Sequence, residues 1–140
     1  MSLVEFLLAR IAEDEAWANA CEGLHWEWRG NDLDDLVTPD PLLDEYIDGD
    51  SVCSLRSVET FPYQSIPGEG PRFLISSAEE TQSTAAGHIV RWDPDRVLAE
   101  CAAKRRIVQW YQWGDVREPV LGPLAAVYAD HPDYDQSWSL

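Results

Sequence analysis

The sequence has little positive charge. Only 10 of its 140 residues are Lys or Arg, against 26 Asp and Glu, so the formal net charge is −16. A surface of that sign repels phosphate groups, which argues against direct binding to nucleic acid or to an anionic membrane. Solubility is the simplest reason for such a surface. The alternative is a basic protein partner, including one that normally binds nucleic acid.

Cysteine and long apolar runs are also scarce. The chain has three cysteines, an odd number, at positions 21, 53 and 101. They are widely spaced and include no Cys-x-x-Cys pair. This pattern argues against both a disulfide framework and a zinc knuckle. No stretch approaches the roughly 18 apolar residues of a membrane span, and the first residues lack the basic region of a signal peptide. We therefore expect a cytoplasmic protein with free thiols.

Recognisable catalytic motifs are missing as well. The sequence contains no Gly-x-Ser-x-Gly elbow, no Gly-rich phosphate loop and no His-Glu-x-x-His pair. A metal site built from His88, Asp93 and His131 is chemically permissible, but the spacing of these residues does not support it. We predict no metal and no cofactor. A small metal-dependent hydrolase that uses His88, His131 and nearby carboxylates is the alternative.

The hydrophobic composition of the chain suits one folded domain. Hydrophobic residues make up 45% of the chain and seven residues are Trp, which is enough apolar surface for a core. We therefore predict a single domain over residues 1–140. Residues 31–50 carry eight acids and no base, a composition typical of an exposed loop. This segment is predicted to be an acidic, loop-rich insertion.

Two long helices are predicted from their capping signals. Ser2 and Glu5 have the spacing of a capping box, so the first helix should begin there. Asp93 can cap the second helix and Pro94 suits its first position. The second helix should end within residues 110–113, just before a glycine.

Short elements complete the predicted fold. Strands are expected over residues 25–29, 52–61, 72–76 and 87–92, and a short third helix over residues 124–129. The economical assembly is an α+β domain. In it, a small antiparallel sheet has the two main helices and the short third helix packed on one face.

Opposite charges are concentrated in the two long helices. Glu13, Asp14 and Glu15 lie in the first, whereas the basic residues Lys104, Arg105 and Arg106 lie in the second. Both clusters adjoin apolar positions with helical spacing. We predict that the acidic cluster lies against the basic one and that the two helices pair.

Three blocks of the sequence, in the same order, resemble a known family. They are residues 3–15, 88–106 and 128–134, the second of which begins with His88-Ile89-Val90-Arg91-Trp92-Asp93-Pro94. In these blocks the chain resembles a family of small uncharacterised actinobacterial proteins that also occurs in phages, domain of unknown function family 6221. The resemblance implies a bacterial or phage origin and brings no activity with it.

Aromatic and basic side chains offer a candidate surface for a protein partner. Trp26 and Trp28, with Trp92, are most simply the apolar face of the sheet. The alternative is an exposed patch, because interfaces favour Trp and Arg. Its candidate residues are Trp26, Trp28, His88, Arg91, Arg96 and Arg105. We predict a non-enzymatic protein-interaction or regulatory accessory domain.

Overall fold

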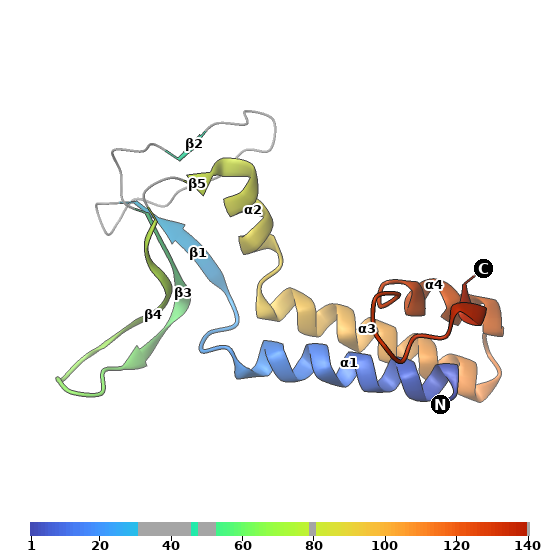
Figure 1. Cartoon of the computed structure of the whole chain (residues 1–140). Helices are drawn as coiled ribbons and strands as arrows, with labels where there is room; N and C mark the ends of the chain where they lie inside the picture. Colours follow the sequence, from blue (N-terminus) through green and yellow to red (C-terminus); the bar gives the residue numbers. More distant parts are fainter. Residues whose placement is uncertain (31–45, 48–52, 79–80, 140) are drawn as a thin grey trace. The chain divides into compact units, whose positions relative to one another are not determined.

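The computed structural model describes residues 1–30, 46–47, 53–78 and 81–139 (Figure 1). These residues form the helices α1 (Leu3–Ala20), α2 (Ser83–Arg91), α3 (Pro94–Trp113) and α4 (Leu121–Ala126). The strands are β1 (Trp26–Arg29), β2 (Tyr46–Ile47), β3 (Cys53–Pro62), β4 (Glu69–Ala78) and β5 (Thr81–Gln82), and two short 3-10 helices are η1 (Glu118–Val120) and η2 (Gln136–Trp138). The predicted α+β class is confirmed.

The chain divides into two compact units. Residues 1–17 and 97–140 form one, here called the helical unit, and residues 18–96 form the other, here called the sheet unit. The acidic insertion predicted over residues 31–50 lies outside the described residues, apart from the two residues of β2, which pair antiparallel with β5.

The sheet of the sheet unit is antiparallel, with the strand order β1-β3-β4. Trp28 lies opposite Leu55, and Leu55 lies opposite Ile75. The strands predicted over residues 25–29, 52–61 and 72–76 are therefore confirmed. Trp28 is only 2% exposed, and its indole Nε1 donates a hydrogen bond of 3.1 Å to the carbonyl of Ala86 in α2. The core of this unit thus lies between the sheet and α2.

The prediction of a strand over residues 87–92 is wrong, because these residues belong to α2 and the turn after it. Ala86 is fully buried, and Ile89 and Val90 pack against the same cluster as Trp28. Positions 86, 89 and 90 have helical spacing and share one face of a helix. The strand prediction began at Gly87 and so omitted the residue that completes this pattern.

The long helices begin and end where their capping signals lie. The Ser2 amide donates to Glu5 Oε2 at 2.8 Å and the Glu5 amide donates to Ser2 Oγ at 3.2 Å, which confirms the capping box. At the start of α3, the Arg96 amide donates to Asp93 Oδ1 at 3.1 Å. After Trp113, Gly114 has a φ of +83°, a conformation that favours glycine and ends a helix.

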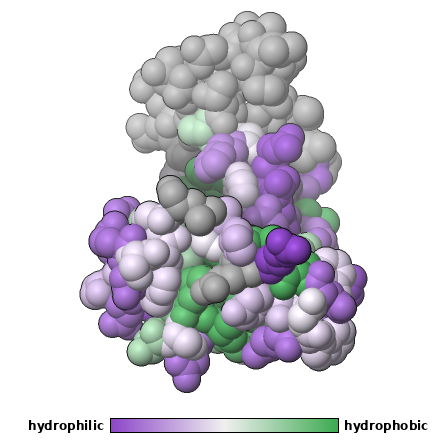
Figure 2. Space-filling model, turned by 90° about the vertical axis from the view of Figure 1, so that its right-hand side faces the viewer, coloured by the Kyte–Doolittle hydropathy of each residue, from purple (hydrophilic) through white to green (hydrophobic). Residues whose placement is uncertain are grey.

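Buried side chains of α1, α3 and α4, together with Tyr134 after α4, form the core of the helical unit. This cluster comprises Phe6, Leu7, Ile11, Cys101, Val108, Leu121, Ala125 and Tyr134. Hydrophobic surface is also visible between hydrophilic side chains in the lower half of the space-filling view (Figure 2). Among the described residues, no helix combines the length and the apolar character needed to cross a membrane.

The short third helix begins earlier than predicted. The sequence indicated residues 124–129, with Pro123 just before them, whereas α4 covers Leu121–Ala126 and the next four residues form turns. Pro123 is the third residue of α4. It is tolerated there because the first amides of a helix have no intrahelical acceptor. Leu121 reaches the core as a result and is fully buried.

Candidate functional site

The two tryptophans of β1 do not form an exposed aromatic patch. Trp28 is buried in the core of the sheet unit, as described above. Trp26 is half-buried and packs against the same cluster. Its indole N–H is buried and has no hydrogen-bond partner among the described residues. The structure therefore favours the reading in which both rings are core residues.

Two of the predicted site residues, His88 and Arg96, lie beside Trp92 in the sheet unit. Trp92 is 42% exposed. The guanidinium carbon of Arg96 lies 4.7 Å from the centre of its ring, and the ring of His88 lies 6.1 Å away. Arg91, two residues before the Asp93 cap, is exposed. In this Trp92 cluster the cationic guanidinium of Arg96 lies over the aromatic ring, an arrangement that a cation–π contact stabilises.

Arg105 lies in the helical unit and has a structural partner. Its Nε donates to Glu15 Oε1 at 2.7 Å and its Nη2 donates to Glu15 Oε2 at 2.6 Å. The hydrogen bonds from Arg105 lower the pKa of Glu15, and those to Glu15 raise the pKa of Arg105. The predicted pairing of the acidic and basic clusters is thus confirmed for these two residues.

A second link between the same helices runs through a tyrosine. Tyr128 donates its hydroxyl to Asp14 Oδ2 at 2.6 Å and accepts a hydrogen bond of 3.1 Å from Lys104 Nζ. Burial and the bond to Asp14 raise the pKa of Tyr128, so its hydroxyl stays protonated. By contrast, Glu13 pairs with Arg10 on its own helix at 2.8 Å. Lys104 and Asp14 therefore meet through Tyr128 rather than directly.

The histidines proposed for a metal site have other neighbours. Nη1 of Arg10 lies 2.6 Å from Nδ1 of His131, and the amide of Asp133 donates to the same nitrogen at 3.1 Å. A guanidinium in this position repels a metal ion. His88 belongs to the Trp92 cluster instead. Within the described ranges, no group of three or more His, Cys, Asp or Glu side chains could hold a metal ion.

A third polar cluster joins His25, the residue before β1, to β3 and to the start of α3 in the sheet unit. Nδ1 of His25 lies 2.6 Å from Glu59 Oε1, and its Nε2 lies 3.6 Å from Asp95 Oδ2. The hydrogen bond to Glu59 is the main reason that the pKa of His25 is raised, and the charges of Asp95 and Asp93 act in the same direction. This exposed cluster connects three parts of the sheet unit through the side chain of His25.

The outer edge of the sheet carries exposed apolar side chains that were not predicted from the sequence. Strand β4 pairs with β3 on one side, and no described strand pairs with its other side. Phe73, Leu74 and Ile75 are 52%, 38% and 41% exposed. Because successive side chains of a strand point to opposite faces, both faces of β4 are open at this position. The available signal was three consecutive apolar residues where one covered face would have required alternation.

Comparisons with known proteins agree with the resemblance found in the sequence. Neither the curated proteins nor the solved structures contain a match to this chain. The model of a family described as "Family of unknown function (DUF6221)" matches residues 1–140. The chain therefore belongs to this family of unknown function.

Proposed function

We propose that the protein is a non-enzymatic interaction domain that binds an extended, basic segment of a partner protein as an added strand along β4. The observation that carries this proposal is the open edge of β4 together with the exposure of Phe73, Leu74 and Ile75. Extended segments commonly bind such edges, with main-chain hydrogen bonds supplying affinity and alternate side chains supplying specificity.

The composition of β4 supports this role. An unpaired edge presents a row of amides and carbonyls, and natural proteins block such edges with charged residues or proline. In β4 these residues occur only at the start of the strand, as Glu69, Pro71 and Arg72. Residues 73–78 contain neither charge nor proline. This part of the edge is therefore open to main-chain pairing.

Charge favours a basic partner over a second copy of the chain. Residues 53–78 contain two acids and two bases, so the β3–β4 hairpin has no net charge. Its exposed apolar residues therefore favour apolar side chains in the bound segment. The whole chain carries −16. That field attracts a positively charged segment and opposes the approach of another copy with the same charge. The expected ligand therefore alternates apolar residues with Lys or Arg.

The test uses a fluorescent synthetic peptide in which Lys and Val alternate, with a Glu–Val peptide of equal length as the probe of charge. Fluorescence anisotropy measures binding, and hydrogen exchange with mass spectrometry locates it. We expect the Lys–Val peptide to bind and to protect amides of residues 72–78. Leu74→Lys should weaken binding by about tenfold or more, because a lysine blocks the edge.

Val127→Lys is the matched control. Val127 is 65% exposed and lies in the helical unit, so its replacement makes the same change in charge without altering β4. It should leave the affinity nearly unchanged. Equal losses in both variants would mean that the peptide binds through net charge alone and would overturn the proposal. Absence of binding, equal binding of the Glu–Val peptide, or a dimer that Leu74→Lys dissociates would also overturn it.

A further inference from the structure

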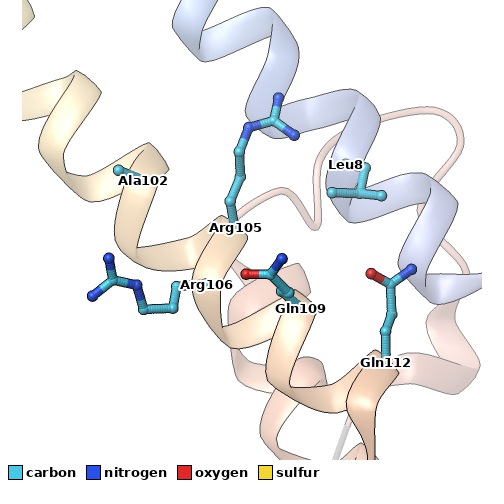
Figure 3. A pocket seen from close by; sticks show the side chains of 6 residues that line it. All are labelled: Leu8, Ala102, Arg105, Arg106, Gln109 and Gln112. Atoms are coloured by element: carbon cyan, nitrogen blue, oxygen red, sulfur yellow. The ribbon is translucent and has the colours of Figure 1, made fainter.

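An open surface groove with a volume of about 470 Å³ lies between α1 and α3 within the helical unit (Figure 3). This volume lies within the range of small-molecule sites. Six residues line this feature, here called the α1–α3 groove: Leu8, Ala102, Arg105, Arg106, Gln109 and Gln112. Arg105, Gln109 and Gln112 extend from α3 on the side that faces α1 (Figure 3). None of the six is acidic, although the chain has 26 Asp and Glu.

Several polar groups of the groove have no partner within the described part of the chain. Gln109 and Gln112 form no hydrogen bond there, and Arg106 forms no ion pair. Arg105 uses Nε and Nη2 for Glu15, which leaves Nη1 as a donor. The groove thus combines guanidinium donors, two carboxamides that both donate and accept, and the apolar side chain of Leu8.

Arg105 is oriented before any ligand arrives. Its two bonds to Glu15 fix the plane of the guanidinium, and a fixed donor loses less conformational entropy on binding. Glu15 also compensates the charge of Arg105, so that Arg106 supplies the uncompensated positive charge at the groove. An anionic group is therefore attracted to a place where donors are already positioned.

We infer that the α1–α3 groove is a binding site for a small organic anion that carries a carboxylate or phosphate group and further hydrogen-bonding atoms. The anionic group would contact Arg106, whose side chain extends away from that of Arg105 (Figure 3), and Nη1 of Arg105 would donate to another polar atom of the same ligand. The carboxamides of Gln109 and Gln112 would bind the polar atoms of the remainder. This inference is independent of the proposed function, because the groove lies in the helical unit and β4 lies in the sheet unit.

The experiment titrates the ¹⁵N-labelled protein with citrate, AMP and inorganic phosphate, and it follows the side-chain amides of Gln109 and Gln112 by NMR. We expect saturable shifts of both amides at millimolar citrate or AMP. Citrate alone would identify carboxylate recognition, and AMP alone would identify phosphate-ester recognition. Arg106→Gln should weaken binding by about tenfold. Gln109→Ala should weaken it too, and circular dichroism should confirm that each variant is folded.

Arg117→Gln is the matched control, because Arg117 is exposed, lies outside the groove and forms no ion pair with the described residues. It should leave both affinities unchanged. The inference is overturned if neither citrate nor AMP shifts the two glutamines. It is also overturned if inorganic phosphate binds as tightly as AMP, or if Arg117→Gln weakens binding as much as Arg106→Gln.

Discussion

Removal of the ion pair between Glu15 and Arg105 should destabilise the helical unit by an amount that a double-mutant cycle can isolate. The pair is bidentate, with bonds of 2.6 and 2.7 Å, and its side chains are 27% and 39% exposed. Exposed pairs contribute about 0.2–1 kcal/mol, and bidentate geometry belongs at the upper end. We therefore expect a coupling of about 1 kcal/mol between Glu15→Gln and Arg105→Gln.

Urea denaturation followed by circular dichroism measures this coupling. It should decrease in high salt, since about 1 M salt shortens the Debye length to about 3 Å. The lowered pKa of Glu15 fixes the pH dependence: the stabilisation is present above the ordinary value of 4.5 and is lost as the pH falls through the folded-state value. Glu13→Gln with Arg105→Gln is the control and should show no coupling, because Glu13 pairs with Arg10. Equal couplings in the two cycles would refute this reasoning.

Two further predictions concern the sheet unit. Trp28→Phe should destabilise it by about 2 kcal/mol, because the variant loses buried volume and the hydrogen bond to the Ala86 carbonyl; a loss below about 0.5 kcal/mol in urea denaturation would contradict this packing. The raised pKa of His25 implies stabilisation that is fully present below the ordinary 6.5 and lost as the pH rises through the folded-state value, chiefly through Glu59. The stability difference between wild type and His25→Gln should therefore shrink as the pH rises from below 6.5 through the folded-state value, and a constant difference would exclude the linkage.

Local signals in the sequence located the ends of the long helices. A capping box and an N-cap depend on residues three positions apart, so Ser2 with Glu5 and Asp93 with the Arg96 amide were readable without the fold. The sequence predicted that the two charge clusters would pair, but it did not predict which individual residues would be partners. Which acid meets which base depends on how each helix is rotated about its axis, and this rotation directs Glu13 to Arg10 and Glu15 to Arg105.

The candidate sites were less accessible to sequence reasoning. The exposure of Phe73 and Ile75 depends on the order of the strands, which places β4 at an edge. That order arises from pairing between distant residues, so no local pattern encodes it. The burial of Trp28 likewise depends on α2, a helix that the sequence pattern did not reveal. The groove requires Leu8 and Gln109, which are brought together only when α1 and α3 pack.

The helical unit is built from both ends of the described chain, and this arrangement affects its synthesis. Phe6 and Ile11 leave the ribosome at least 110 residues before Leu121 and Ala125, with which they form one core. At roughly 5–20 residues per second, the apolar face of α1 waits roughly 5–20 s for those partners. During that interval the helix depends on its own residues. The Ser2–Glu5 capping box uses only nearby atoms, so it can stabilise the nascent helix before its partners have been translated.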